Sequence, residues 1–532
     1  MRFGSITTNI IADGLVYSID PANRASTIPS TSTDKTFNTI NMAISGAFSG
    51  NAQYDSSTIS PSFGFDGVSD TITTTSGLDF FDGTDQFTVE LWFLLTDDRS
   101  QNKDVISKGN TSTNNTQFFI RKGKNTNGNK IFGFLDNAGS KYVGGATAVS
   151  NDTWINVAFV YKGYESSNND KARIYLNGVN DSNSFASGLP SSLVTTTQPL
   201  RIGEWQTAAT DFEGNVGCVH IYNRALSATE VMKNFNALKD RMGYVAPITV
   251  TFLVVAGGGG SMGGYVRGVG GGGAGGLRTS FGSTSGGGAS AESNITALPG
   301  TSYTVTIGAG GAGPANATNA FNLGNSGNSS VFASITSIGG GRGGSGNNGN
   351  GSTGGSAGGH GGTSNSIPTS GTTGQGTAGG TNNNSGIGAG GGGASTAGTA
   401  GASGGTGGNG LAVSVTGTSV TYAGGGGGGA NAGTGGTGGT GGGGNGGTKS
   451  TQTSGVDGSI NTGGGAGGAV NIPLGFNGGY GPGHSGGSGV VILRYSSDYT
   501  ITSGAGLTSS TTTSGGDKIT IFTAGTDTIT FS

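Results

Sequence analysis

The 532-residue chain is poor in charge, cysteine and long apolar runs. Its 25 basic and 28 acidic residues leave a net charge of −3, so we expect no nucleic-acid partner, which would be held through phosphate contacts. One cysteine, Cys218, excludes an internal disulfide and a four-cysteine zinc site. The three histidines lie far apart and form no short metal-ligand pattern. No stretch approaches 18 apolar residues, so no membrane insertion is expected.

The N-terminus, "MRFGSITTNIIADG", lacks the long apolar core of a secretory signal peptide. We therefore expect a protein that is made in the cytoplasm and is stable without disulfides.

Glycine divides the chain into two halves of different composition. Of the 116 glycines, 22 precede Ala256, and glycine makes up about a third of the residues from there to the end. A third is the proportion found in collagen, but no strict G-X-Y period exists and there are 11 prolines in all, which excludes collagen.

The half before Gly243 has the composition of a globular β domain. Strands are expected at Phe87–Leu95, Thr153–Tyr161 and Ala172–Asn180, which are rich in Val, Ile, Phe and Tyr. Asn177-Gly178 is a strong hairpin signal because both residues tolerate positive φ. Short strands between polar clusters favour an antiparallel sandwich over alternating strands and helices.

One helix is expected in "LSATEVMKNFNALKDRMG". Ser227 and Glu230 have the spacing of a capping box, and Gly243 suits the end of the helix. The apolar face consists of Val231, Phe235, Leu238 and Met242.

Seven segments follow one another between Asp13 and Gly243: "DGLVYSIDPANRAS", "FGFDGVSDTITT", "FTVELWF", "WINVAFVY", "RIYLNGV", "LRIGEW" and "FEGNVGCVHIYNRALSATEV". Their order resembles that of a laminin-G-like, concanavalin A-type jelly roll. The resemblance implies two packed antiparallel sheets and, commonly, recognition of carbohydrate or protein at the rim.

Within that resemblance, Trp205 and Asp211 are candidates for carbohydrate binding. Trp205 follows a strand-like "LRIG" and could stack on a sugar, although packing beneath a loop is the alternative, and Trp92 and Trp154 are expected in the core. Some members of the family hold calcium at the rim; Asp97, Asp98 and Asp211 could supply oxygens, or they could be solvated loop carboxylates. No other cofactor is expected. Related glycanases use an E-x-D-x-E pattern, which is absent here, so we expect no enzyme.

The second half alternates glycine tracts with short strand-like pieces. In "SVTYAGGGGGGANAG", for example, Val420–Ala423 runs into Gly424–Gly429, and Val254–Gly260 repeats the design. In "ALPGTSYTVTIG", a turn at Pro299-Gly300 is expected to precede a strand.

Four explanations of the glycine compete. A phosphate-binding loop needs a helix after it, and none follows any glycine block. A linker need not contain apolar strands, and phase separation would need more aromatic residues and arginines within the tracts. The fourth is a lattice of polyglycine-II-type helices, which have three residues per turn and no internal hydrogen bonds, and which can bond to one another laterally. We therefore expect short strands that anchor such helices.

Five segments of this half, "FLVVAGGGG…GGGGAGGLR", "LPGTSYTVTIGAGG", "NSSVFASITSIGGGRGG", "TGTSVTYAGGGGGG" and "GSGVVILRY", resemble the glycine-rich domain of bacteriophage tail-fibre and adhesin proteins. The resemblance implies packed polyglycine-II helices with variable loops that contact the host, here Gly344–Thr396 and Gly429–Pro482. His360 and His484 fall in or beside these loops and are candidate host contacts; solvated loop histidines are the alternative.

The fold expected is therefore mainly β: a jelly-roll domain at 1–246, a glycine-rich domain at 247–496 and a C-terminal β-hairpin tail at 497–532. The function favoured is a bacteriophage virion protein, a tail-fibre, spike or appendage component that contacts other virion proteins and binds a host-surface glycan or envelope protein. The alternatives are a capsid decoration or head fibre with a purely structural role, a glycan depolymerase, and a bacterial surface adhesin. Phage fibres are often trimers, but no heptad or β-helical repeat demands one here.

Overall fold

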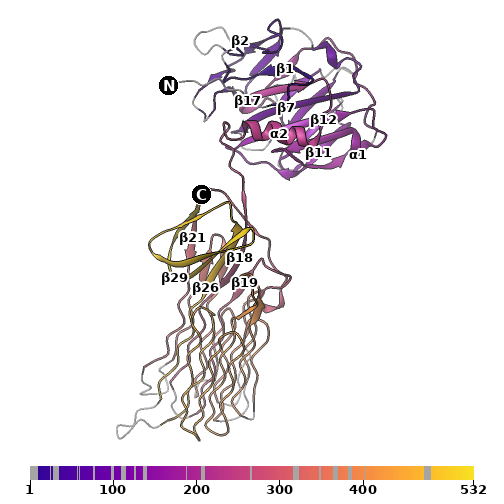
Figure 1. The fold of residues 1–532 in the computed structure, drawn as a ribbon. Coiled ribbons are helices and arrows are strands. Elements are labelled where there is room, and N and C mark those ends of the chain that lie inside the picture. Colours follow the sequence, from indigo (N-terminus) through magenta and orange to yellow (C-terminus); the bar gives the residue numbers. More distant parts are fainter. Residues whose placement is uncertain are drawn as a thin grey trace. The chain divides into compact units, whose positions relative to one another are not determined.

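In the computed structural model, the chain forms two compact units that divide between Val245 and Ala246 (Figure 1). We describe residues 10–23, 25–27, 35–56, 58, 60–75, 78–96, 101–109, 116–124, 127–135, 140–186, 188–204, 210–263, 267–315, 323–346, 349–362, 369–381, 386–401, 403–472 and 481–532.

The N-terminal unit is a sandwich of two antiparallel sheets, as predicted, and its strands alternate between inward and outward side chains. The first sheet, sheet A, runs in the order β14 (Val179–Asn180), β13 (Ala172–Leu176), β12 (Trp154–Lys162), β7 (Gln86–Leu95), β17 (Glu213–Tyr222), β5 (Ser62–Asp66), β4 (Gln53–Asp55), and β1 (Leu15–Ile19) pairs with β17. The second sheet, sheet B, runs β15 (Ser182–Phe185), β11 (Tyr142–Ala148), β10 (Lys130–Phe134), β9 (Phe118–Lys122), β8 (Lys103–Lys108), β16 (Leu200–Ile202), β6 (Thr71–Thr74), β3 (Ser45–Ser49), β2 (Lys35–Phe37).

The core between the sheets is aromatic. Phe87 of sheet A meets Phe159 edge to face, with ring centroids 5.5 Å apart, and it packs against Phe118 of sheet B at 5.3 Å. All three rings are fully buried. The expected hairpin is also present, since Asn177 and Gly178 have φ of 49° and 79° between β13 and β14.

Helix α2 (Ala228–Leu238) covers the outer face of sheet A (Figure 1). Both hydrogen bonds of the predicted capping box between Ser227 and Glu230 are present. The predicted apolar face is buried, together with Trp92, Trp154 and Cys218 of the sheet; Met242 lies in the turn beyond the helix. Short helices are also present at η1 (Asp79–Phe81) and α1 (Asn168–Lys171).

The second unit starts from an antiparallel sheet. Its order is β19 (Leu277–Thr279), β18 (Ile248–Val255), β26 (Val490–Ser496), β29 (Asp517–Phe531), β21 (Ser302–Thr306), β22 (Ser330–Phe332), β23 (Ile335–Ser337). Strand β20 (Ile295–Ala297) pairs with β18, β27 (Ile501–Ser503) and β28 (Leu507–Ser514) pair with β29, and β24 (Leu411–Val413) pairs with β25 (Val420–Tyr422); η3 (Gly286–Gly288) is a 3-10 turn. The expected turn is present, with Gly300 at φ 75°.

The predicted C-terminal tail needs correction. Residues 497–532 do contain a hairpin, β28–β29, but β29 lies inside the sheet and pairs with both β26 and β21. Phe522 and Phe531 are fully buried in the core of that sheet. The tail therefore belongs to the same unit as the glycine-rich segments, because its apolar side chains complete their core.

Below this sheet, the glycine tracts form the predicted lattice (Figure 1). The N–H groups of Gly424–Gly429 donate outward and return to the same neighbouring segment every third residue. The donor–acceptor pairs are Gly424–Gly441, Gly425–Gly408, Gly426–Gly272, Gly427–Gly444, Gly428–Gly405 and Gly429–Val269, with N···O distances of 2.8 to 2.9 Å. A repeat of three with no internal bonds is the pattern of a polyglycine-II helix. We call each such segment a glycine helix.

The carbonyl groups of the same glycine helix accept from three other segments. The acceptor–donor pairs are Gly424–Gly465, Gly425–Gly439, Gly426–Gly391, Gly427–Gly468, Gly428–Gly436 and Gly429–Gly388. Several of these neighbours come from Gly344–Thr396 and Gly429–Pro482. Much of these two intervals therefore belongs to the lattice rather than to the predicted host-contacting loops.

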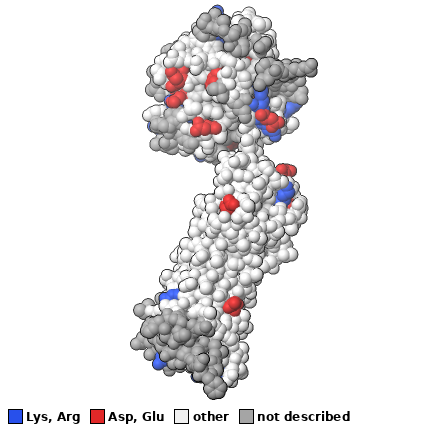
Figure 2. All heavy atoms as spheres, turned by 90° about the vertical axis from the view of Figure 1, so that its left-hand side faces the viewer, with Lys and Arg blue, Asp and Glu red and all other residues white. Residues whose placement is uncertain are grey.

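Threonine and asparagine terminate the lattice at its surface. In "GTGGTGGT", Thr434, Thr437 and Thr440 are exposed at every third residue, while the glycines between them lie inward. Side-chain oxygens there replace a further glycine helix as acceptors: Asn445 Oδ1 accepts from Gly438 N at 2.8 Å. On the face shown in Figure 2, few charged residues lie on this unit. The N–H of Gly438 is thus satisfied at the edge by a side chain rather than by another glycine helix.

Candidate functional site

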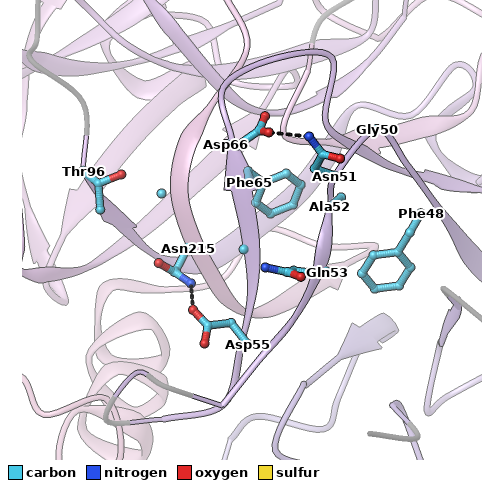
Figure 3. A pocket seen from close by; sticks show the side chains of 12 residues that line it. Phe48, Gly50, Asn51, Ala52, Gln53, Asp55, Phe65, Asp66, Thr96 and Asn215 are labelled. Atoms are coloured by element: carbon cyan, nitrogen blue, oxygen red, sulfur yellow. Dashed lines mark hydrogen bonds between the residues drawn. The ribbon is translucent and has the colours of Figure 1, made fainter. Parts of the chain in front are cut away.

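A groove opens at the edge of sheet A in the N-terminal unit, with a volume of about 640 Å³ (Figure 3). We call it the rim groove. It is lined by Phe48, Gly50, Asn51, Ala52, Gln53, Asp55, Gly64, Phe65, Asp66, Thr96, Gly214 and Asn215. These residues come from β3, β4, β5 and β17, and from the end of β7.

Gly214, which lines the groove, lets β17 pack closely against its neighbouring strands. Gly214 pairs with Leu95 of β7 and with Phe65 of β5, and its φ is 140°. A Cβ at this position would lie 2.0 Å from the carbonyl oxygen of Leu94. A side chain is therefore excluded both by space and by backbone conformation.

The turn after β5 fixes one wall. Asp66 Oδ1 accepts from Val68 N at 2.8 Å, which makes a local Asx turn. The buried carboxylate of Asp70 accepts from the backbone N–H groups of Asn51 and Asp66, so it ties this turn to the segment before β4. These bonds leave Asp66 at the mouth of the groove, exposed to solvent.

Two side-chain amides hold the carboxylates that line the groove (Figure 3). Asn51 Nδ2 donates to Asp66 Oδ2 at 2.6 Å, and Asn215 Nδ2 donates to Asp55 Oδ2 at 2.8 Å. Asn215 also donates to Ser62 Oγ at 3.0 Å. Gln53 is exposed beside them. Fixed carboxylate and amide groups around an open floor suit a ligand with many hydroxyl groups.

The hydrogen bonds from Asn51 and Val68 lower the pKa of Asp66, because they stabilise the ionised carboxylate. Asp66 is therefore an acceptor rather than a general acid near neutral pH. Burial raises the pKa of Asp70, but its oxygens already accept from two backbone N–H groups. A glycosidase needs one carboxyl that acts as a general acid and a second that acts as a nucleophile or general base, and Asp66 and Asp70 do not form such a pair.

Of the residues that the sequence placed at the rim, the structure describes only Asp211. Trp205, Asp97 and Asp98 lie outside the described residues. Asp211 is 1% exposed, and its Oδ2 accepts from Ser69 N at 2.8 Å. Asp211 therefore supports the turn behind the rim groove and does not line it.

No ion is assigned to the rim. Among the described residues, no group of three or more His, Cys, Asp or Glu side chains is arranged to hold a metal. Asp211 Oδ1 has no hydrogen-bond partner in the described part of the chain, but both oxygens of the nearby Asp104 accept from Arg121, at 2.7 and 2.9 Å. A single orphan oxygen does not supply the several ligands that calcium takes.

The two lattice histidines are not solvated, contrary to the alternative considered for them. His360 is 0% exposed and its backbone N–H donates to Gly380 O, so it is part of the lattice. The side chain of His484 is 12% exposed and contacts Asp457 and Ser454. Burial lowers the pKa of both imidazoles, and Asp457 opposes that effect at His484. A buried His360 has no surface to offer a receptor.

Sequence reasoning missed the groove residues themselves. Asn51, Gln53 and Asp55 follow a short strand with no clear pattern, so nothing in the sequence places them beside β17. One signal was present: Asn215 is an amide inside an apolar strand, "GNVGCVHIY". A polar residue at such a position needs partners, and one of them, Asp55, lines the groove.

In the described part of the chain, no helix has the length and apolar character needed to cross a membrane.

Comparison with known proteins agrees with this division. Residues 66–232 match the family model of the concanavalin A-like lectin/glucanases superfamily, and residues 245–496 match that of the glycine-rich domain. Among curated proteins, none matches the chain.

Solved structures give weak likenesses. Trypanosoma rangeli sialidase in complex with sialic acid is 14% identical over 43% of this chain, with a TM-score of 0.32, and the match covers 33% of the sialidase. Domain 4 of AbnA, a GH43 extracellular arabinanase from Geobacillus stearothermophilus, in complex with arabinotriose, is 16% identical over 41% of this chain and 97% of the domain, with a TM-score of 0.29. The SAP-like pentraxin of Limulus polyphemus is 14% identical over 29% of this chain and 70% of its own, with a TM-score of 0.25. We take nothing about a ligand from likenesses this weak.

The sandwich, the glycine lattice and the two family matches together identify a domain of the concanavalin A-like lectin/glucanases superfamily followed by a glycine-rich domain.

Proposed function

We propose that this chain is a virion protein of a tailed bacteriophage, a tail-fibre, spike or appendage component that binds a host-surface glycan. The rim groove carries the binding part of the proposal. It presents Asn51, Gln53, Asp55 and Asp66 around an open floor, and these groups suit sugar hydroxyls.

The glycine lattice supports the virion part of the proposal. Each N–H and C=O of Gly424–Gly429 is hydrogen-bonded to a neighbouring segment, so a protease could cleave this glycine helix only after the lattice opens locally. Such a rigid, weakly charged unit suits a protein that works outside the cell on a particle. The resemblance to phage tail-fibre adhesins supports the same role.

We propose binding without catalysis. Asp66 has a lowered pKa, and the buried carboxyl groups with raised pKa, such as Asp104, are already bonded to other groups of the protein. Asp104 in particular accepts two bonds from Arg121. Release of reducing ends from host polysaccharide by the purified chain would contradict this part of the proposal.

A double variant, Asn51→Ala with Gln53→Ala, tests the rim groove. Each truncation removes one hydrogen bond between the protein and the saccharide, worth about 1 kcal/mol, so the affinity for the saccharide should fall at least tenfold. The measurement is binding of the full chain to an array of neutral and acidic saccharides and to purified host polysaccharide. The matched control, Asn223→Ala, removes an exposed amide outside the groove and should change nothing. Equal binding by the double variant and the control would exclude the groove as the site.

A second experiment tests where the chain resides. Labelling of whole particles with an antibody to the chain should mark the tail or an appendage. Labelling of the head would favour the alternative, a capsid decoration or head fibre. Absence of the chain from purified particles would exclude both virion roles. The measurement of saccharide binding by the rim groove does not depend on that result.

A further inference from the structure

The outer face of sheet B carries a second groove, separate from the rim groove. We call it the outer-sheet groove; its volume is about 430 Å³ and it is lined by Asn102, Arg121, Asn127, Lys130, Phe132, Phe134, Tyr142, Gly145, Asn183 and Ser184. Strands β9, β10, β11 and β15 supply most of the lining. The outer face of sheet A is covered by α2, whereas these side chains line a groove that is open on sheet B.

The strand register explains why these residues share one face. Ile120, Ile131 and Val143 point into the core between the sheets. Their neighbours along each strand must point the opposite way, because successive side chains alternate. Arg121 lies opposite Phe132, which in turn lies opposite Gly144.

Aromatic rings form the floor of the outer-sheet groove. Phe119 and Phe134 stack with centroids 4.3 Å apart and planes inclined by 10°. Phe132 meets Tyr142 edge to face at 5.8 Å, and both rings are half-buried, so part of each faces solvent. Exposed aromatic surface on a fixed sheet suits the C–H face of a sugar ring.

Glycine leaves the space above these rings. A Cβ at Gly144 would lie 2.7 Å from a ring carbon of Phe132 and 2.5 Å from Ser184 Oγ. At Gly145, a Cβ would lie 2.4 Å from Asp181 Oδ2. Asn102, Asn127, Asn183 and Ser184 then supply polar groups around the opening. The result is an apolar floor with amide and hydroxyl groups at its edge.

Positive charge is concentrated in the strands that form this groove. From residue 101 to residue 148 the chain has seven Lys and Arg residues and two Asp, although the whole chain has a small excess of acidic residues. Arg121 is neutralised by its two bonds to Asp104 and lies over the rings of Phe119 and Phe134, at 4.9 and 5.6 Å. Lys130 lines the groove, and within the described residues no carboxylate pairs with it.

We propose that the outer-sheet groove binds an anionic saccharide. A sugar ring lies on Phe132 and Tyr142, and its carboxylate or sulfate pairs with Lys130. Arg121, held by Asp104, positions the aromatic floor and contributes little net charge. This site is independent of the rim groove and of the virion role, so either proposal can fail without the other.

The test is calorimetric titration of the full chain with an oligogalacturonate, a sulfated oligosaccharide and a neutral oligosaccharide of equal length. We expect both anionic probes to bind more tightly than the neutral one, and the difference to shrink as salt is raised. Stronger binding of one anionic probe shows which of the two charged groups, carboxylate or sulfate, the outer-sheet groove prefers. Equal affinity for all three, or binding to none, would overturn the proposal.

Three variants assign the contacts. Lys130→Gln should weaken anionic binding about tenfold and leave neutral binding unchanged, because a charge-assisted contact is lost. Phe132→Leu should weaken binding of all the probes that bind, because it removes the ring but keeps an apolar side chain. The control, Lys233→Gln on α2, removes an exposed charge elsewhere and should have no effect. The assignment to this groove would be contradicted if Lys130→Gln bound the anionic probes as tightly as the wild type. It would also be contradicted if the Asn51→Ala, Gln53→Ala variant of the rim groove lost this anionic binding.

Discussion

Replacing Gly426 by alanine should destabilise the glycine-rich unit by about 3 kcal/mol or more, at or above the upper end for overpacking. A Cβ there would lie 1.9 Å from the carbonyl oxygen of Ala466. That segment cannot move aside easily, because Ala466 N donates to Gly259 O and Ala466 O accepts from Gly272 N. The change should appear as a lower unfolding temperature and as faster proteolysis of the unit, by about a hundredfold if cleavage follows the unfolded population.

Gly516→Ala is the matched control for this experiment. Gly516 lies in the hairpin turn between β28 and β29, and a Cβ there would meet nothing within 4 Å. The same chemical change should therefore be neutral, or stabilising by about 0.5 kcal/mol because it restricts the unfolded chain. Equal stability of the two variants would mean that the lattice can make room for a methyl group.

Glu90→Gln should change how the stability of the N-terminal unit depends on pH. Glu90 is fully buried on β7, and burial raises its pKa to about 7 from 4.5; bonds from Asn234 and Asn156 oppose this. Between these two values the folded protein keeps a proton that the unfolded chain releases. The contribution of Glu90 to the free energy of unfolding is therefore complete below pH 4.5 and is lost as pH rises to about 7, by about 3 kcal/mol in all.

His220 changes the pH dependence of the unfolding free energy in the direction opposite to Glu90. It is buried, and burial lowers its pKa to about 4 from 6.5, so its contribution increases as pH rises through that range. In the wild type the two effects largely cancel. In Glu90→Gln, the free energy of unfolding of the unit should rise from pH 4.5 to 6.5, because the contribution of His220 is no longer opposed. Between pH 4.5 and 7, the difference in unfolding free energy between the variant and the wild type should change by about 3 kcal/mol.

Denaturant titrations at a series of pH values measure this difference. Glutamine suits the site, because within the described residues Asn156 Oδ1 has no hydrogen-bond partner, and after a flip of the Asn156 amide this oxygen could accept from the glutamine Nε2. Glu165→Gln, on the segment after β12, removes a carboxyl that is not buried and should leave the pH profile of the wild type. Parallel profiles for wild type and Glu90→Gln would show that Glu90 is ionised in the folded protein.

Local signals in the sequence predicted the local structure well. The capping box at Ser227, the turn at Asn177-Gly178 and the strand at Val420–Tyr422 follow from side chains that are neighbours along the chain. The anchored glycine lattice could also be predicted, because a strand precedes each of several glycine tracts and glycine alone permits such close packing.

Which segments lie side by side could not be predicted. The partners of Gly424–Gly429 come from all along the second unit, and glycine has no side chain whose pattern could specify them. Hence Gly344–Thr396 resembled a loop, and His360 a solvated residue. The rim groove was missed for a related reason: it joins Asn51 to Asp66 and Asn215 to Asp55 across separate strands, through contacts distant in sequence.

The threonines at the surface of the lattice also determine where this protein can vary. Inside, successive residues face different neighbouring segments, so a side chain at any of the six residues from Gly424 to Gly429 would meet a backbone oxygen within 2.4 Å. At Thr434, Thr437 and Thr440 the side chain points outward instead. Related sequences should therefore keep the inner glycines and diversify at one residue in three along the outermost helices, in a pattern that an alignment of natural variants could display directly.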